Sequence, residues 1–143
     1  MPDPAVRETV EWAVATRCRP GEEITGDRAV VAVLPEGALV AAIDGVGHGG
    51  EAARAAVTAA EVVRERPSSD LALLAERCHR ALRGTRGAAL SLAFISSIER
   101  AMTWLGVGNV EGRVLSGDPA ARRPKGSLAL GSGIAGHELP SVR

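Results

Sequence analysis

The chain has 143 residues, with 17 basic and 17 acidic side chains and therefore no formal net charge at pH 7. This length predicts one domain with a buried core, and the lack of a basic excess argues against a protein that binds nucleic acid through its phosphates. Aromatic residues make up only 2% of the chain, which argues against a surface that stacks nucleic-acid bases.

No apolar run reaches the roughly 18 residues that a membrane-spanning helix needs, and the first residues lack the basic and apolar regions of a signal peptide. The two cysteines, Cys18 and Cys78, lie far apart and outside any Cys-x-x-Cys pair. We therefore predict two small buried thiols rather than a disulfide or a zinc site. These features together predict a cytoplasmic protein that binds neither membrane nor nucleic acid.

The first part of the chain predicts three β-strands. Apolar and polar residues alternate over residues 9–16, which is the period of a half-buried strand. Residues 28–34 and 38–43 are almost wholly apolar, and only Pro35-Glu36-Gly37 separates them. A connection this short predicts an antiparallel hairpin.

Two helices and further strands are predicted after the hairpin. Polar side chains recur every three or four residues over residues 51–65, which is typical of a helix with a narrow exposed face. A Pro-Ser-Ser-Asp segment ends this helix and caps a second one over residues 71–82. Short strands are then predicted over residues 89–95, 101–105, 113–116 and 127–130.

The order of these elements predicts the fold class. Strands come first, two consecutive helices follow, and more strands complete the chain, without regular alternation of strand and helix. This order favours an α+β domain with mainly antiparallel sheets over a doubly wound parallel sheet.

Asp27 and Asp44 are expected to meet at the open end of the hairpin. With the turn centred on residue 36, Arg28 lies opposite Asp44 and Asp27 opposite Gly45, within one or two residues of register. Two carboxylates beside an apolar core repel each other, so that one takes up a proton or a cation lies between them. Arg28 could be that cation, but the glycine-rich run that begins at Asp44 favours Mg²⁺ or Mn²⁺ together with a phosphate group.

The run Asp44-Gly45-Val46-Gly47-His48-Gly49-Gly50 also contains the Gly-x-Gly-x-x-Gly spacing of a dinucleotide site. An aspartate before the first glycine would place a negative charge beside a pyrophosphate. The acidic residue expected about 20 positions later is Glu65, which lies inside a predicted helix rather than after a parallel strand. We therefore disfavour this interpretation, which requires a parallel sheet.

Gly26-Asp27, a hairpin and then Asp44-Gly45-Val46-Gly47-His48-Gly49 resemble the motifs of the metal-dependent (PPM, type 2C) serine/threonine protein phosphatases. The segments 106–112 and 131–140 resemble the SpoIIE-like bacterial branch of that family, and within it the RsbX-like group. The resemblance implies a four-layer α/β/β/α sandwich of mainly antiparallel sheets flanked by helices. The family's later metal-binding aspartate has no counterpart in this sequence, so we expect residues 1–143 to form a single domain that is incomplete at its C-terminal side.

By the same resemblance, Asp44 bridges two Mn²⁺ or Mg²⁺ ions, the Gly45 carbonyl binds one of them, and Asp27 joins the cluster directly or through water. A metal pair of this kind activates a bridging water for in-line attack on a phosphate, without a phosphoenzyme. For His48 two roles stay open. It either donates a proton to the leaving oxygen or only makes a hydrogen bond within the glycine loop.

Other polar side chains are expected to have no role in the chemistry. Glu22 and Glu23 precede the strand of Asp27 closely enough to reach the site through water, but we favour solvated loop carboxylates. We expect His79 and His137 to be structural or solvated. The basic residues within 122–125 could bind an acidic or phosphorylated partner, but we favour a solvated charge cluster.

The resemblance predicts hydrolysis of phosphoserine or phosphothreonine on a bacterial signalling protein of a stressosome or anti-sigma pathway. The alternative is a catalytically incomplete domain that keeps the fold and binds a regulatory partner. The missing C-terminal ligands favour this alternative, and Asp27 and Asp44 oppose it. The sequence predicts no oligomeric state.

Overall fold

A computed structural model of the protein describes residues 10–115, 117, 127–128 and 132–139. Its main feature is one antiparallel sheet in which the strands lie in the order β1-β2-β3-β4. These strands are β1 (Asp27–Leu34), β2 (Gly37–Gly45), β3 (Ala88–Ser96) and β4 (Ala101–Val107). A second, two-stranded antiparallel sheet contains β5 (Gly112–Arg113) and β6 (Ser127–Leu128).

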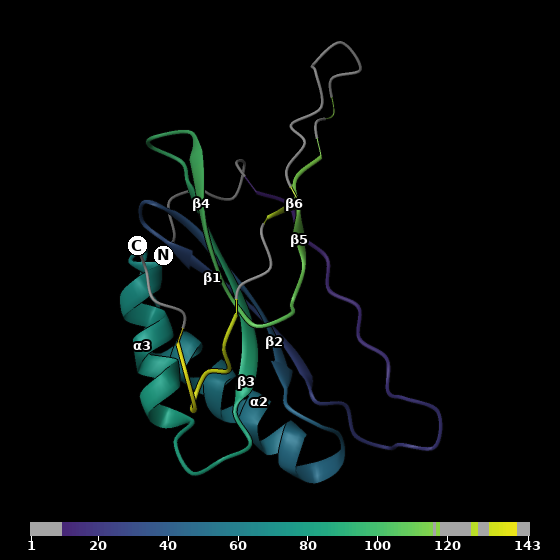
Figure 1. The fold of residues 1–143 in the computed structure, drawn as a ribbon. Helices are drawn as coiled ribbons and strands as arrows, with labels where there is room; N and C mark the ends of the chain where they lie inside the picture. The colour runs from purple at the N-terminus through teal and green to yellow at the C-terminus, as the bar shows by residue number, and fades with distance from the viewer. Residues whose placement is uncertain (1–9, 116, 118–126, 129–131, 140–143) are drawn as a thin grey trace.

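Two helices connect β2 to β3 and pack on one side of the large sheet (Figure 1). They are α2 (Gly49–Glu65) and α3 (Leu71–Ala81). The side chain of Asp70 caps α3, because its Oδ1 accepts a hydrogen bond of 3.0 Å from the amide of Leu73. No helix among the described residues is long and apolar enough to cross a membrane.

The core lies between the helices and the sheet. The larger buried side chains come from the sheet and from α3, among them Leu39, Leu90 and Leu74. The buried face of α2 consists mostly of alanine, a good helix former whose small side chain lets the helix approach the sheet closely. The buried residues of α2 are Ala52, Ala53, Ala55, Ala56, Ala59, Ala60 and Val63.

The predicted hairpin is present, but its register differs by one residue from the prediction. Asp27 pairs directly with Asp44, and Leu34 pairs with Gly37. The connection consists of Pro35 and Glu36 alone, because Gly37 already belongs to β2. A side chain at Gly37 would collide with the backbone of Ile95 on β3, so this glycine is needed inside the sheet rather than in the turn.

Two predicted strands differ from the structure, and a third is described only in part. Residues 10–16 have no regular secondary structure, and Trp12 and Val14 are 50% and 57% exposed, so the strand predicted over residues 9–16 is wrong for this part. Alternating polarity does not form a strand where no neighbouring strand supplies hydrogen bonds. The strand predicted over residues 113–116 is found at Gly112–Arg113, and of residues 127–130 the described part, Ser127–Leu128, is strand. The predicted basic loop within residues 122–125 lies outside the described residues.

The expected four-layer α/β/β/α sandwich is wrong. The described residues form one four-stranded sheet with two helices on one face and the short β5–β6 pair. A sandwich needs a second large sheet against the other face, and the described part of the chain supplies no strands for one. On that other face, side chains such as Val31, Val40 and Trp104 are half-buried rather than enclosed.

The parallel sheet that a dinucleotide site would require is also not found. Every strand pairing in the two described sheets is antiparallel. The Gly-x-Gly-x-x-Gly spacing therefore does not lie in a βαβ unit.

The end of β2 approaches α2 at Gly45, where a Cβ atom would collide with the carbonyl oxygen of Ala52. We expect Gly45→Ala to lower the free energy of unfolding by about 1–3 kcal/mol, because the helix must move away from the sheet. Gly50→Ala is the matched control, since nothing lies within 4 Å of its Cβ position in the first turn of α2. We expect it to be neutral or to stabilise by up to about 1 kcal/mol. Urea denaturation measures both, and equal effects would contradict the close packing.

Candidate functional site

Two carboxylates face each other at the open end of the hairpin. Asp27 begins β1, Asp44 lies near the end of β2, and the two are direct partners in the antiparallel ladder. Direct partners have Cα atoms about 4.5–5.5 Å apart and carry their side chains on the same face of the sheet. Because Val30 and Ile43 face the helices, alternation places both carboxylates on the opposite face.

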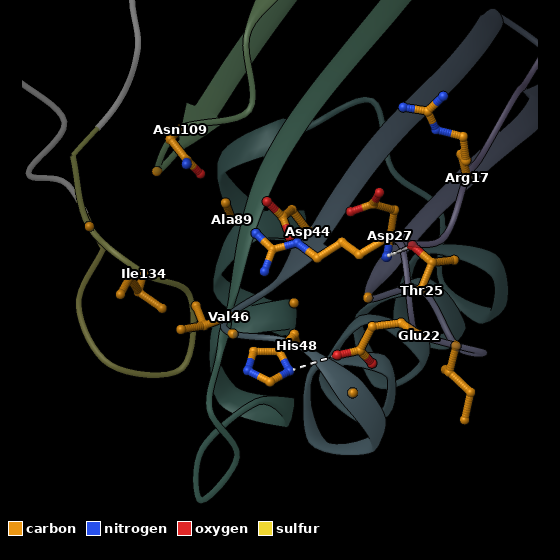
Figure 2. Close-up of a pocket in the computed structure, with 18 residues that line it drawn as sticks. Arg17, Glu22, Thr25, Asp27, Asp44, Val46, His48, Ala89, Asn109 and Ile134 are labelled. Atoms are coloured by element: carbon orange, nitrogen blue, oxygen red, sulfur yellow. Dashed lines mark hydrogen bonds and ion pairs between the residues drawn. The ribbon is translucent and has the colours of Figure 1, made fainter.

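The two carboxylates line a cavity of about 770 Å³ (Figure 2). Its wall comes from parts of the chain that are distant in sequence: the loop before β1, the glycine-rich loop after β2, and single residues from β3 and from the segments after β4. Besides the two aspartates, the polar side chains in this wall are those of Arg17, Arg19, Glu22, Thr25, His48 and Asn109. No sequence pattern predicts a role for Arg17, Arg19 or Asn109, because only the tertiary structure brings them to this cavity.

Burial raises the pKa of the Asp44 carboxyl above its ordinary value, and the negative charge of Asp27 raises it further. The positive charge of Arg19 acts in the opposite direction. An acidic pair of this kind favours a bound cation, because a cation relieves both the repulsion and the cost of burying the charge.

Arg28, the alternative cation of the sequence analysis, does not pair with either carboxylate. Its Nη1 donates hydrogen bonds to the backbone carbonyls of Thr25 and Asp27, at 3.0 Å and 2.7 Å. Arg19 is the described cation whose charge acts on Asp44. It follows the exposed residues 11–17 and precedes a Pro-Gly turn, and this position in the sequence does not predict that its charge acts on Asp44.

The glycine-rich loop runs from the end of β2 into α2. Gly47 and Gly49 have φ angles of 92° and 73°, in the left-handed region that favours glycine. A Cβ atom at Gly47 would lie 2.7 Å from Nη1 of Arg86, so this glycine also leaves room for an arginine side chain. The loop thus exposes backbone beside the two carboxylates, at the start of a helix.

His48 lies at the N-cap position of α2, where its side chain makes no capping hydrogen bond. Instead its Nδ1 lies 2.9 Å from Oε1 of Glu22, in the loop before β1 (Figure 2). The hydrogen bond that the sequence analysis considered for His48 therefore reaches outside the glycine loop. Glu22 is half-buried and paired, whereas the sequence analysis expected a solvated carboxylate. Glu23 is exposed, as expected.

The other two histidines hold the segment 132–139 against the domain. The amide of Gly136 donates a hydrogen bond of 3.0 Å to Nδ1 of His79, and Nε2 of His137 lies 3.1 Å from the carbonyl oxygen of Thr85. Ala135 forms an isolated β-bridge with Ala88. Through these contacts the segment brings Gly133 and Ile134 to the wall of the cavity.

The cysteines form no disulfide. Cys78 is buried in the core, and burial raises the pKa of its thiol to about 11. Cys18 is half-buried rather than fully buried as predicted. The buried Cys78 therefore offers no reactive thiolate.

The acidic pair fits a hard divalent cation by its donor chemistry, since Mg²⁺ and Mn²⁺ prefer carboxylate and carbonyl oxygens. Among the described residues, no group of three or more His, Cys, Asp or Glu side chains is arranged to hold a metal ion. The roles of Asp27, Asp44 and the Gly45 carbonyl as metal ligands therefore stay predictions.

Comparison with known proteins relates the chain to a phosphatase. No protein-family profile matches it. It is 29% identical over 103 residues to "Phosphoserine phosphatase RsbX" of Bacillus subtilis (strain 168), an alignment that covers 72% of this chain and 52% of that protein. The chain thus spans about half the length of this relative.

Two solved structures are similar to this fold. One is described as "The bacterial stressosome: a modular system that has been adapted to control secondary messenger signaling", with a TM-score of 0.77 and 34% identity over 87% of this chain and 62% of that chain. The other is "Crystal structure of RsbX in complex with magnesium in space group P1", with a TM-score of 0.62 and 29% identity over 66% of this chain and 48% of that chain. These similarities support a relationship to the PPM-like phosphatases.

The raised pKa of Asp44 predicts how the stability of the metal-free protein depends on pH. The folded state holds the Asp44 proton more tightly than the unfolded state, so stability falls as pH rises from the ordinary aspartate range through the raised pKa. Asp44→Asn removes this loss, and we expect the variant to gain stability relative to the wild type with increasing pH in EDTA. Urea denaturation from pH 3.5 to 8 measures the difference. A difference that is independent of pH would contradict the shift.

Proposed function

We propose that this protein is a metal-dependent phosphatase that hydrolyses phosphoserine or phosphothreonine on a bacterial signalling protein. The observation that carries the proposal is the direct pairing of Asp27 with Asp44 in a cavity beside a glycine-rich loop. The similarity to RsbX, whose name gives the phosphoserine specificity and whose solved structure contains magnesium, supports it.

In this proposal Asp44, Asp27 and the carbonyl of Gly45 hold two Mn²⁺ or Mg²⁺ ions. When bound, such ions neutralise phosphate charge and lower the pKa of a coordinated water for in-line attack. The chain itself contributes the negative charges that attract the cations. It also contributes the backbone opening at Gly47 and Gly49, through which a phosphate group can approach the start of α2.

Two further side chains contribute to the same chemistry in this proposal. Arg19 places a positive charge near Asp44, where it can attract the phosphate of the substrate. The imidazole of His48 lies in the wall of the cavity and is 65% exposed, so it can reach a substrate and donate a proton to the leaving serine or threonine oxygen.

The partner in this proposal is a phosphorylated regulatory protein of a bacterial stress-signalling pathway, of the stressosome or anti-sigma type. The resemblance to RsbX and the similarity to a structure described as a bacterial stressosome support this class of partner. The cavity, with a volume of about 770 Å³, is large enough to receive a side chain that carries a phosphate.

A second candidate function is a non-catalytic domain that binds such a partner without hydrolysis. The observation that favours it is that the described residues bring together only part of a metal coordination shell. The two functions differ in metal dependence, since only the phosphatase requires the cation for its activity.

We expect the protein to hydrolyse a phosphoserine peptide and 4-nitrophenyl phosphate with Mn²⁺ and to lose this activity in EDTA. Asp44→Asn should lower kcat/KM by at least about 100-fold. Mutation of a residue that only hydrogen-bonds to a metal ligand typically lowers activity about 10–100-fold, and loss of a ligand itself should lower it more. Glu99→Gln is the control, because it removes an exposed carboxylate in the turn between β3 and β4. Equal rates for wild type and Asp44→Asn, or no metal-dependent rate in either, would favour the non-catalytic function.

Binding of the cation can be measured without turnover. We expect saturating Mn²⁺, at about 100 times its dissociation constant, to stabilise the wild type by about 2.7 kcal/mol. Asp44→Asn should show much less of this stabilisation, because it lacks a carboxylate charge that would hold the cation. Thermal unfolding with and without Mn²⁺ measures it, and the same increase in both proteins would place the cation elsewhere.

A further inference from the structure

We infer that Glu22 is a positioning residue that orients the imidazole of His48 for transfer of a proton to the leaving oxygen. This inference rests on the proposed phosphatase function and adds to it a residue outside the glycine-rich motif. It also decides between the two roles that the sequence left open for His48.

The contact between the two side chains joins separate parts of the chain. Oε1 of Glu22 lies 2.9 Å from Nδ1 of His48, which is a normal length for a hydrogen bond between a ring nitrogen and a carboxylate. Glu22 belongs to the loop before β1, and His48 lies 26 residues later at the start of α2. The carboxylate is the better shielded partner, with 27% of its side chain exposed against 65% for His48.

Short-range contacts hold Glu22 in place. Its amide donates a hydrogen bond of 3.0 Å to the carbonyl of Arg19, across a turn in which Gly21 has a φ angle of 83°. At the other end of the loop, the amide of Gly45 donates a hydrogen bond of 3.0 Å to the carbonyl of Gly26. The loop is therefore fixed to the strand that carries Asp44.

The start of α2 does not need the imidazole. An N-cap residue normally uses its side chain to accept a hydrogen bond from the first turn, and Ser, Thr, Asp and Asn do this best. His48 has the extended backbone of an N-cap, with φ of −149° and ψ of 171°, but makes no such bond. The hydrogen bond of its ring with a described residue is the one to Glu22.

A carboxylate at Nδ1 determines what the other nitrogen can do. It accepts the Nδ1–H hydrogen bond and favours the tautomer that keeps this proton, so that Nε2 is the nitrogen that exchanges a proton with the substrate. Figure 2 shows Nδ1 turned toward Glu22 and the second ring nitrogen on the side of the ring away from it. Nε2 makes no hydrogen bond with the described residues, and His48 lines the same cavity as the two aspartates.

Hydrolysis of phosphoserine in this scheme moves one proton through His48. The bond between phosphorus and the serine oxygen breaks, and its electron pair stays on that oxygen, which takes the proton from Nε2 of the imidazolium. The oxygen of the attacking water forms the new bond to phosphorus, and the proton lost by this water restores the imidazolium. The products are free serine and inorganic phosphate, and the Nδ1 proton stays between His48 and Glu22 throughout.

The test compares two leaving groups. A serine alkoxide needs a proton to leave, whereas 4-nitrophenolate is the anion of a much stronger acid and leaves without one. We expect Glu22→Gln to lower the ratio of kcat for a phosphoserine peptide to kcat for 4-nitrophenyl phosphate by about 10-fold or more, in line with the 10–100-fold effect of residues that orient a histidine. Glu23→Gln removes the same charge from the neighbouring exposed residue and should leave the ratio unchanged.

A double-variant cycle tests whether Glu22 acts through His48. In a His48→Ala protein, adding Glu22→Gln should lower the ratio no further, because the group that Glu22 orients is gone. A ratio that stays at the wild-type value in Glu22→Gln, or a further loss in the double variant, would overturn the inference.

A readout without turnover separates this inference from the proposed function. In the metal-free protein, ¹⁵N chemical shifts of the neutral His48 ring should show the proton on Nδ1, and Glu22→Gln should move it toward Nε2. A proton on Nε2 in the wild type would overturn the inference even if the protein is active. A wild-type protein that hydrolyses neither substrate with Mn²⁺ would overturn the proposed function, and the proton-transfer role of Glu22 with it.

Discussion

The two-residue connection at Pro35 and Glu36 determines the register of β1 against β2, and the site depends on that register. It places Asp27 directly opposite Asp44, on the face of the sheet away from the helices. Because β3 also pairs with β2 and fixes the face of Asp44, a shift of β1 by one residue would turn the Asp27 side chain to the opposite face of the sheet. The packing of α2 and the pairing of β2 with β3 offset the cost of holding the two carboxylates together.

The packing of α2 supplies much of that stability. Its alanine face lies against β1 and β2, and the absence of a side chain at Gly45 allows the end of β2 to touch Ala52. The same glycine begins the loop that leads into the helix, so the close contact that stabilises the fold also positions the loop of the site. The amide of Gly45 donates a hydrogen bond to the carbonyl of Gly26, and this bond connects the loop before β1 to the end of β2. Hydrogen bonds therefore connect the acidic pair, the glycine loop and Glu22 to one another.

The acidic pair and the Glu22–His48 pair divide the proposed chemistry between them. Burial and the charge of Asp27 raise the pKa of Asp44. A bound cation would stabilise the ionised carboxylates, so the same electrostatics favour cation binding. The imidazole at the start of α2 is exposed and is held from one side only, which suits a group that meets a substrate. A domain that only binds a partner would need neither the repelling carboxylates nor the oriented ring, and the proposed experiments separate these two cases.

The sequence predicts the hairpin, the two helices and the proximity of Asp27 to Asp44. These features depend on the spacing of apolar residues, on turn residues and on a short connection, all of which involve residues close together in the sequence. The four-layer sandwich and the strand over residues 9–16 could not be predicted correctly, since a strand or a layer exists only if a distant segment pairs with it. The same limit applies to the site. Asp44 and His48 stand in a recognisable motif, but the charge of Arg19 near Asp44 and the hydrogen bond between His48 and Glu22 depend on a loop that only the tertiary structure brings against the start of α2.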